Sequence, residues 1–262
     1  MDCVVNVDAD WKAVRVHARR MGEEGPTTVF VHGWATTSQV WAPVLERWHT
    51  FTGTALAIDL PGVGWSSKPP TGYTIERWAT ALAQFIESLD GPVVLVGHSM
   101  GGLISQRAAL LLGGRLQRLI LVSPVPASGV PLPQAAVQGF EALAGTRAGM
   151  AQVLSSMMVT PPSGGGFDRL VDASASVSDA AYVEGLRAWT SASFAEELAA
   201  LTVPTRVLCG AQEQPLSPDL LRNTVLRHIP GSTLATIPGV GHYPQLEDTD
   251  AFCDALDLAL RA

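Results

Sequence analysis

Cysteine is scarce in this sequence, and the few that occur lie far apart. Cys3, Cys209 and Cys253 cannot all pair with one another, and none takes part in the CxxC or Cys/His spacing of a zinc site. We therefore expect no bound metal. Such sparse and scattered cysteine usage is typical of a reducing, cytoplasmic setting.

Long apolar runs and an excess of positive charge are also missing. No uninterrupted apolar stretch approaches the ~18 residues of a membrane span, and the first 20 residues lack the apolar region of a secretory signal. Lys and Arg total 17 against 24 Asp and Glu, so the formal net charge of -7 should repel a phosphate backbone. These absences predict a soluble intracellular protein with no nucleic-acid partner and no membrane partner.

Apolar material, by contrast, is plentiful. Hydrophobic residues make up 47% of the 262 residues and charged residues 16%, which excludes general disorder and is enough for one large core or at most two small domains. Short, nearly continuous apolar strands separated by helices are typical of a parallel sheet that is covered on both faces, so we expect an α/β fold. The expected strands are Thr28–Val31, Ala55–Ile58, Val93–Val96, Leu119–Val122, Val207–Cys209 and Leu234–Ile237.

Near the N-terminus the pattern is different. Apolar and polar residues alternate from Val14 to Arg19, a period of two that is typical of an antiparallel edge strand with one face in water. We therefore expect an antiparallel opening to a mixed, mostly parallel sheet. Thr74 is predicted to cap one helix, because it precedes a run with helical apolar spacing. The expected helices are Ser38–Trp48, Ile75–Leu89, Ser99–Leu112, Pro218–His228 and Asp248–Leu260.

The stretch from Pro124 to Pro204 interrupts this alternation, because it contains helical patterns and no convincing strand. Prolines at its start predict a hinge, and residues 161–166 (PPSGGG) predict a mobile loop. We expect residues 125–203 to form a helical insert in a core made of residues 1–124 and 204–262. Its clearest helical runs are Met150, Val153, Leu154 and Met157, and then Tyr182, Leu186 and Trp189 after Ser178, a predicted N-cap.

The strongest chemical signal is the pentapeptide Gly97–Gly101 (GHSMG), which follows a predicted strand and opens a predicted helix. In a G-x-S-x-G turn the serine stands at a strained apex, and the two glycines leave it room. The amides of the helix N-terminus then face the space above the serine hydroxyl, where an oxyanion would develop. Because of this context we interpret Ser99 as a nucleophile rather than as part of a chance Gly/Ser turn.

A serine nucleophile needs a base, and histidine is the residue best suited to the task. His242 lies in a glycine-rich loop, residues 238–244 (PGVGHYP), between the last predicted strand and the last predicted helix. We predict that His242 is the base; the alternative is a loop histidine that caps the final helix. His32 ends a strand and is expected to organise a turn. The remaining histidines are less suited by position: His17 on the edge strand, His49 and His228 near helix ends, and His98, which should point sideways.

Together these motifs resemble the α/β-hydrolase fold, in the form of the capped esterases and arylesterases related to cofactor-free haloperoxidases and carboxylesterases. The resemblance is specific for the superfamily rather than for one activity, since one fold hosts many chemistries. It covers about residues 14–260 and depends on His32–Trp34, on Asp59–Ser66, on the turn at Ser99 and on Gly241–His242.

The resemblance implies roles for further residues. In that family the loop after His-Gly and the residue after the nucleophile each donate a backbone N–H to an oxyanion hole, and the matching residues are Trp34 and Met100. His32 would then be structural, and Asp59–Ser66 would be a tight loop rather than the site of a catalytic carboxylate. The resemblance also implies that the insert covers the serine as a cap, and that no metal or organic cofactor takes part.

The acid is the position at which this sequence departs from the family. Members usually carry aspartate about three residues after a glycine that ends a strand, whereas Glu213 stands three residues after Gly210 here. A glutamate can still accept the imidazole N–H and stabilise the imidazolium, and the chain order Ser99, Glu213, His242 is the order of the fold. We interpret Glu213 as the acid; an acid from elsewhere, or none, stays open. Residues 123–125 (SPV) offer no acid after the Leu119–Val122 strand.

These residues predict a serine hydrolase that cleaves small to medium, largely apolar carboxylic esters or lactones through a Ser-His-Glu triad and an acyl-enzyme. One alternative is a carbon-carbon bond hydrolase for dienone acids or an esterase for carrier-linked acyl esters, in which Arg147, Arg169 and Arg187 could serve an acidic group. Another is a receptor-like protein with slow turnover, which only the unusual Glu213 favours.

Substrate selection is expected to depend on the insert. Methionine and aromatic side chains at helical spacing are more often internal packing than ligand contacts, so we expect only one or two of the insert's candidates to contact the substrate. The sequence leaves a monomer and a homodimer equally open. The candidates are Phe140, Met150, Met157, Trp189 and Phe194, with Trp34 at the floor of the pocket.

Overall fold

The computed structural model describes residues 2–7, 11 and 14–261 and contains one eight-stranded sheet in the order β1-β2-β4-β3-β5-β6-β7-β8. From β4 onward neighbouring strands run parallel, and every residue of β3, β4 and β5 is buried. The prediction of a mostly parallel α/β sheet is confirmed. The strands are β1 (Asp2–Val7), β2 (Val14–Gly22), β3 (Thr27–Val31), β4 (Thr54–Asp59), β5 (Val93–His98), β6 (Leu116–Val122), β7 (Thr205–Gly210) and β8 (Thr233–Ile237).

The sheet opens with antiparallel strands, as the alternating N-terminal pattern predicts, but β2 is not its edge. β1 pairs with the outer side of β2, while β2 pairs antiparallel with β4 on its inner side. β1 was not among the predicted strands, because its apolar run, Cys3–Val5, is only three residues long and is bounded by the polar Asp2 and Asn6.

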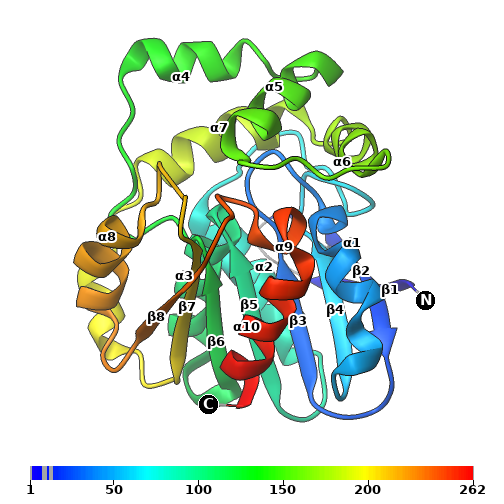
Figure 1. The fold of residues 1–262 in the computed structure, drawn as a ribbon, viewed down its shortest axis with the longest axis vertical. Coiled ribbons are helices and arrows are strands. Elements are labelled where there is room, and N and C mark those ends of the chain that lie inside the picture. The colour runs from blue at the N-terminus through cyan, green and yellow to red at the C-terminus, as the bar shows by residue number, and fades with distance from the viewer. Residues whose placement is uncertain (1, 8–10, 12–13, 262) are drawn as a thin grey trace.

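Helices cover both faces of the sheet (Figure 1). In the view of Figure 1, α1, α9 and α10 lie in front of the sheet and α2 and α3 lie behind it. The side chain of Thr74 accepts the N–H of Arg77, which confirms the predicted cap of α2. The helices outside the segment between β6 and β7 are α1 (Ala42–Glu46), α2 (Ile75–Glu87), α3 (Met100–Leu112), α8 (Pro218–Leu221), α9 (Pro244–Glu247) and α10 (Thr249–Arg261).

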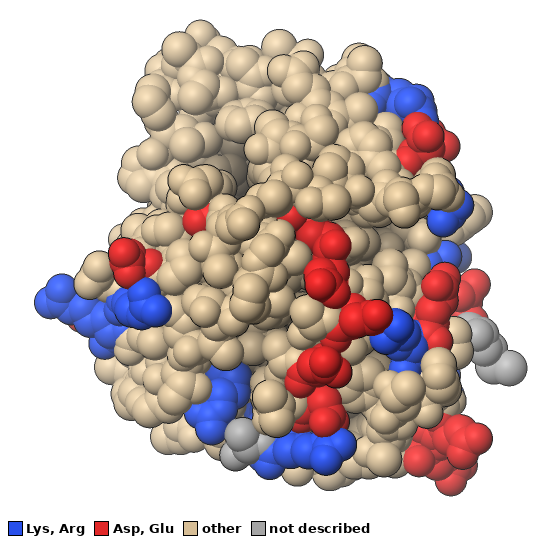
Figure 2. Space-filling model, in the orientation of Figure 1, with Lys and Arg blue, Asp and Glu red and all other residues tan. Residues whose placement is uncertain are grey.

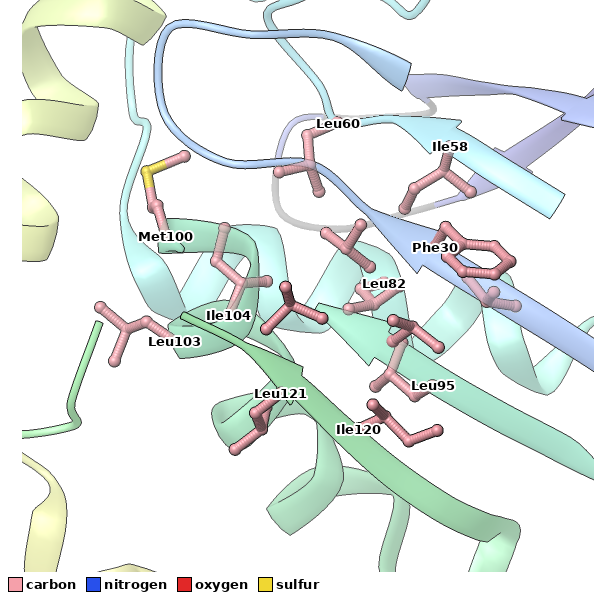
Figure 3. Packing of buried hydrophobic residues seen from close by; sticks show 14 of the residues in the cluster. Phe30, Ile58, Leu60, Leu82, Leu95, Met100, Leu103, Ile104, Ile120 and Leu121 are labelled. Carbon is pink, nitrogen blue, oxygen red and sulfur yellow. The ribbon is translucent and has the colours of Figure 1, made fainter. Parts of the chain in front are cut away.

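The core lies between the sheet and these helices. Figure 3 shows Leu95 of β5 near Leu82 of α2 and Ile104 of α3. Phe30 of β3 faces the opposite side of the sheet, where its ring centre lies 5.0 Å from that of Trp41. Phe30, Leu82, Leu95 and Ile104 are all fully buried. This packing holds the end of β5 and the start of α3 in place. Ser99 lies in the turn between them.

The helix expected over Ser38–Trp48 is broken into three short pieces. A 3-10 turn covers Ser38–Trp41, α1 follows, and a second 3-10 turn covers Trp48–Thr50. Pro43 stands in the first turn of α1, where its missing N–H costs nothing, whereas within one continuous helix it would break a backbone hydrogen bond. The sequence prediction was wrong in treating this segment as one helix.

The insert between β6 and β7 consists of helices that lie above the carboxyl ends of the parallel strands (Figure 1). Ser178 accepts the N–H of Ala181 at the start of α7, as predicted. The outermost helix, α4, has no fully buried residue. The division of the chain at residues 125 and 203 stays a prediction. The helices are α4 (Gln134–Glu141), α5 (Arg147–Met157), α6 (Gly166–Ser174) and α7 (Asp179–Thr190), followed by a 3-10 segment, Ala195–Ala200.

Charged side chains are unevenly distributed over the face shown in Figure 2. Most of them lie over the sheet and its covering helices, while the upper part, over α4 and α5, shows few. The surface is hollowed between this upper part and the core beneath it (Figure 2). Within the described part of the chain, no helix has both the length and the hydropathy that crossing a membrane requires.

Candidate active site

Ser99 stands at the turn between β5 and α3 in a strained conformation. Its φ is 55° and its ψ is -121°, which a non-glycine residue adopts only when the surrounding structure enforces it. A Cβ added at Gly97 would lie 2.4 Å from the Ser105 hydroxyl, and one at Gly101 would lie 2.2 Å from the carbonyl oxygen of His32. Both glycines are therefore required by close packing, as the pentapeptide predicts.

A continuous series of hydrogen bonds begins at this serine. The Ser99 Oγ lies 3.0 Å from Nε2 of His242, and Nδ1 of His242 lies 2.7 Å from Oε2 of Glu213. All three side chains are almost completely buried. The structure thus brings together Ser99, Glu213 and His242 from the ends of β5, β7 and β8, in the geometry of a nucleophile, a base and an acid that orients the base.

Glu213 is held so that its carboxylate points at the imidazole. Its Oε1 accepts the backbone N–H of Leu216 over 3.2 Å, while Oε2 faces His242. Burial alone would raise the pKa of Glu213, but the charge and hydrogen bond of His242, together with hydrogen bonds from the Leu216 N–H and the Ser123 hydroxyl, outweigh burial and lower it. The carboxylate is therefore ionised at neutral pH, the form that accepts the imidazole N–H.

The two residues whose backbone amides are predicted to form an oxyanion hole belong to segments that adjoin Ser99. Met100 is the first residue of α3, so its N–H has no acceptor within the helix. Trp34 follows Gly33, where an added Cβ would lie only 3.0 Å from the Cβ of Ser99. The loop that carries Trp34 thus passes directly against Ser99.

His32 organises a turn, in agreement with its predicted structural role. Its Nδ1 donates to the carbonyl oxygen of Gly33 over 2.8 Å, and its Nε2 accepts the N–H of Leu60 over 3.1 Å. Burial lowers the pKa of His32 despite the opposing effects of Asp59 and Gly33, so the ring stays neutral and keeps both bonds.

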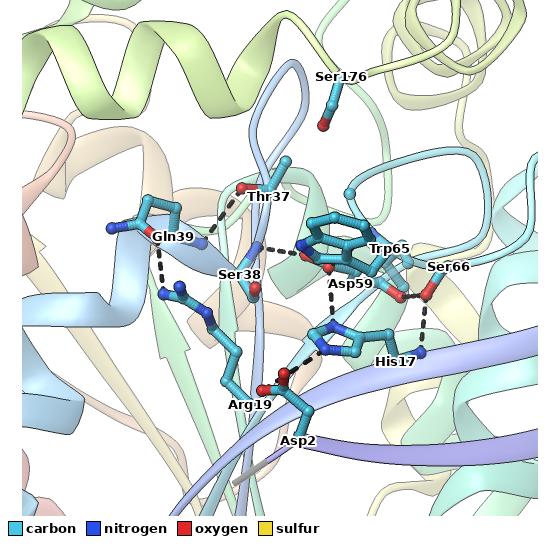
Figure 4. A network of polar contacts seen from close by, with 12 residues as sticks. Asp2, His17, Arg19, Thr37, Ser38, Gln39, Asp59, Trp65, Ser66 and Ser176 are labelled. Atoms are coloured by element: carbon cyan, nitrogen blue, oxygen red, sulfur yellow. Dashed lines mark hydrogen bonds and ion pairs between the residues drawn. The ribbon is translucent and has the colours of Figure 1, made fainter.

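Asp59 is a buried carboxylate that holds groups around the end of β4. Its Oδ1 accepts the N–H of Ser38 over 2.8 Å, and its Oδ2 accepts the N–H of Trp65 over 3.0 Å (Figure 4). The ring of His17 approaches the same Oδ2 to 3.1 Å. These contacts close the loop after β4, as expected for a tight loop rather than a catalytic acid.

An apolar cavity of about 260 Å³ opens above the serine. Its lining contains Ser99 and His242, and no lysine or arginine among the described residues. Trp34 forms part of the wall, held by a 2.7 Å hydrogen bond from its indole N–H to the carbonyl oxygen of Tyr182 in α7. The other lining residues are Val125, Val130, Leu132, Phe140, Ser156, Met157, Trp189, Pro215, Leu216 and Tyr243.

Of the predicted substrate contacts, Trp34, Phe140, Met157 and Trp189 line this cavity. Met150 and Phe194 do not. Met150 is a buried residue of α5. Phe194 packs under Arg107, whose guanidinium carbon lies 5.4 Å from the centre of the Phe194 ring. Helical spacing alone could not separate the side of α5 that packs internally from the side that faces the serine.

The sequence interpretation missed the other cavity residues. Val130 and Leu132 belong to the proline-rich segment before α4, which has no periodic pattern to mark an inward face. Leu216 and Tyr243 could have been found, because they lie close in sequence to Glu213 and His242. Within residues 2–7, 11 and 14–261, no three His, Cys, Asp or Glu side chains gather closely enough to hold a metal ion.

Comparisons with known proteins identify the family and agree with the fold. The sequence model of a family described as "Alpha/beta hydrolase family" matches residues 28–255. A non-heme chloroperoxidase from Streptomyces lividans is 28% identical over 256 residues, covering 83% of this chain and 89% of the relative. A pimeloyl-[acyl-carrier protein] methyl ester esterase from Pseudoalteromonas atlantica is 26% identical over 260 residues, covering 90% and 95%.

A solved structure shares the fold over nearly its whole length. An esterase from Exiguobacterium antarcticum superposes with a TM-score of 0.87 at 20% sequence identity, covering 95% of this chain and 97% of the other.

Proposed function

Because the chain belongs to the alpha/beta hydrolase family, we propose that it is a serine esterase for small, largely apolar carboxylic esters or lactones. Ser99 acts as the nucleophile, His242 as the base and Glu213 as the acid that orients the base. One observation carries the proposal: the hydrogen-bonded series from Glu213 through His242 to Ser99 ends in an apolar cavity of about 260 Å³. Such a cavity can hold the acyl or alcohol group of an ester whose carbonyl carbon lies at the serine oxygen.

The acylation half of the reaction forms one bond and breaks another. The Ser99 oxygen attacks the carbonyl carbon while its proton passes to Nε2 of His242 over the existing 3.0 Å hydrogen bond. Glu213 stabilises the resulting imidazolium from Nδ1. The negative charge on the former carbonyl oxygen faces the N–H groups of Trp34 and Met100. The carbon–oxygen bond to the alcohol then breaks, and the alcohol leaves with the proton of His242.

Deacylation repeats these steps with water. His242 takes a proton from a water molecule, whose oxygen attacks the acyl carbon, and the proton returns to Ser99 as the carboxylic acid leaves. No electron is transferred in either half, so the reaction needs only the ester and water.

The size and polarity of the cavity support the proposed substrate class. Its volume of about 260 Å³ is just below the roughly 300–1,000 Å³ typical of sites for drug-sized ligands, which favours short or compact groups. The absence of a cation from its described lining makes burial of a carboxylate unfavourable, because a charge without a partner loses its hydration. This argues against the hydrolysis of dienone acids.

Two insert arginines that could serve an acidic group are already paired on the outside. Arg147 is bonded to Asp168 and Asp172, and Arg187 is bonded to Glu141. An ester on a carrier protein is a second candidate, since one relative is named for that activity. Comparing the same short ester free in solution and attached to a carrier separates the two candidates.

The deciding experiment measures turnover of p-nitrophenyl esters of increasing acyl length by wild type and by Ser99→Ala. We expect an optimum at short acyl chains, and a loss of about a thousandfold or more in the variant. Labelling of Ser99 by a p-nitrophenyl phosphonate, followed by mass spectrometry, is the parallel measurement. An adduct that persists in Ser99→Ala would contradict the assignment of the nucleophile. Labelling without any ester turnover would instead favour a carrier-linked substrate or a receptor-like protein.

A further inference from the structure

Glu247, the last residue of α9, gathers backbone N–H groups from two distant segments. Its Oε1 accepts the N–H of Tyr243 over 2.9 Å. Its Oε2 accepts three more: those of Gly241 over 3.1 Å, Val159 over 2.8 Å and Thr160 over 3.1 Å. A single carboxylate therefore joins the loop that carries His242 to the segment that follows α5 (Figure 1).

Both joined segments contribute to the site. Gly241 and Tyr243 flank His242 directly, and Val159 lies two residues beyond Met157, which lines the cavity. The backbone N–H of His242 also donates to the carbonyl oxygen of Met157 over 3.3 Å. The backbone of His242 is thus hydrogen-bonded to Met157 of the cavity wall, close to Glu247.

The chemistry of the position requires a carboxylate. An ionised glutamate only accepts hydrogen bonds, so both of its oxygens can face the four N–H groups that converge here, one on Oε1 and three on Oε2. Hydrogen bonds to a charged acceptor are also shorter and stronger than those to a neutral one. The junction is tight, because a Cβ added at Gly241 would lie 3.0 Å from the Val159 side chain and 3.4 Å from Oε1 of Glu247.

We propose that Glu247 is a positioning residue of the esterase site, which through one carboxylate sets both the place of His242 and the Met157 wall of the cavity. The proposal deepens the esterase function and rests on it. Glu247 touches no reacting atom; it acts on turnover through the backbone of the base and on substrate size through the insert. Loss of its carboxylate therefore changes both the rate and the preferred acyl length.

Glu184 of α7 provides a matched control. Its Oε2 accepts the N–H groups of Gly72 and Tyr73 over 2.8 and 2.7 Å, so it too is a glutamate that fastens the insert to the rest of the chain through backbone amides. Neither Gly72 nor Tyr73 lines the cavity, and neither is next to Ser99, Glu213 or His242 in the sequence. A general loss of attachment of the insert should affect both glutamates alike, whereas positioning of His242 should affect only Glu247.

The experiment compares wild type, Glu247→Ala and Glu184→Ala at a temperature at which thermal unfolding curves show all three fully folded. For each protein we measure kcat and KM over the p-nitrophenyl ester series and the rate of Ser99 labelling by a p-nitrophenyl phosphonate. In Glu247→Ala we expect kcat and the labelling rate to fall about 10- to 100-fold, as for a small misplacement of a reacting group, and the acyl-length profile to flatten. In Glu184→Ala we expect changes below about threefold in kcat and an unchanged profile.

Equal losses in the two alanine variants, or a wild-type kcat and profile in Glu247→Ala, would overturn the proposal. Should Glu247→Ala fail to fold, Glu247→Gln decides. Its single carboxamide oxygen can keep the three bonds of Oε2 while its NH2 group opposes the N–H of Tyr243, so a several-fold fall in kcat supports the proposal and wild-type kcat refutes it. If wild type turns over no ester, the esterase function fails, and the labelling rates still test the role of Glu247.

Discussion

The imidazole of His98 donates a hydrogen bond from Nε2 to the backbone carbonyl oxygen of His242 over 2.8 Å. The residue next to Ser99 thus supports the backbone of His242, and the rings of His98 and His242 lie with their centres 4.9 Å apart. Burial, followed by the charge of His242, lowers the pKa of His98 well below its usual value, so the ring is neutral and carries its proton on Nε2. The sequence interpretation had His98 pointing sideways and did not include its contact with His242.

Replacement of His98 should therefore impair turnover more than binding. In His98→Phe the donor is lost and the carbonyl of His242 is left without it, so we expect kcat to fall about tenfold with KM nearly unchanged. His98→Gln retains an N–H donor and should keep more of the activity. Steady-state kinetics on one short ester, with circular dichroism to verify folding, provides the measurement. An equal fall in kcat in His98→Phe and His98→Gln would show that the packing of the ring matters rather than its hydrogen bond.

The buried histidines also predict how stability depends on pH. Burial lowers the pKa of both His32 and His98 from 6.5, so below pH 6.5 the unfolded chain binds protons that the folded chain does not. The free energy of unfolding should therefore decrease as the pH falls below about 6.5, by up to about 1.4 kcal/mol per pH unit for each histidine. Glu213, whose pKa is lowered from 4.5, loses its stabilising contribution only at lower pH, as its carboxylate becomes protonated.

Urea unfolding at pH 7.5, 6.5 and 5.5 measures this slope. The comparison protein is His98→Gln, which lacks one of the two titrating groups and should show a smaller decrease over the same range. Identical slopes for the two proteins would contradict the assignment of His98 as a buried neutral group.

Glu213 should be needed for turnover but not for folding. In Glu213→Gln the carboxamide can still accept the N–H of Leu216, but the imidazolium loses its charged partner, so we expect kcat to fall about 100- to 10,000-fold. Glu213→Asp withdraws the carboxylate by about one methylene, so its kcat should lie between those of wild type and Glu213→Gln. Wild-type kcat in Glu213→Gln would assign the acid to another residue.

Phe140 should limit the acyl length. It lies in α4 with its ring edge-on to Trp34, at a centre distance of 5.6 Å, and lines the cavity. Phe140→Ala enlarges the cavity and should shift the optimum to longer p-nitrophenyl esters. Because the ring is only partly buried, we expect a loss of stability below the roughly 3–5 kcal/mol typical of a fully buried phenylalanine. An unchanged optimum would mean that the acyl chain takes another direction.

Features fixed by local sequence were the most predictable. The GHSMG turn, the apolar strands and the cap at Thr74 depend on neighbours within a few residues, so their patterns are visible in the chain. β1 could not be predicted from its own residues, because it depends on pairing with β2 and on contacts with α2. The role of Glu247 could not be predicted either, because its partner Val159 lies 88 residues away in the sequence. Contacts between side chains and distant backbone amides follow no periodicity.

The separation of Ser99, Glu213 and His242 along the chain also bears on how the site assembles during folding. The bond between Ser99 and His242 closes a separation of 143 residues, and β7 and β8 must pair before Glu213 and His242 can meet. Six of the seven tryptophans, all but Trp189, precede Ser99 in the sequence. In refolding, intrinsic fluorescence therefore reports mainly on the first part of the chain, whereas recovered hydrolysis reports on the arrival of the last two strands.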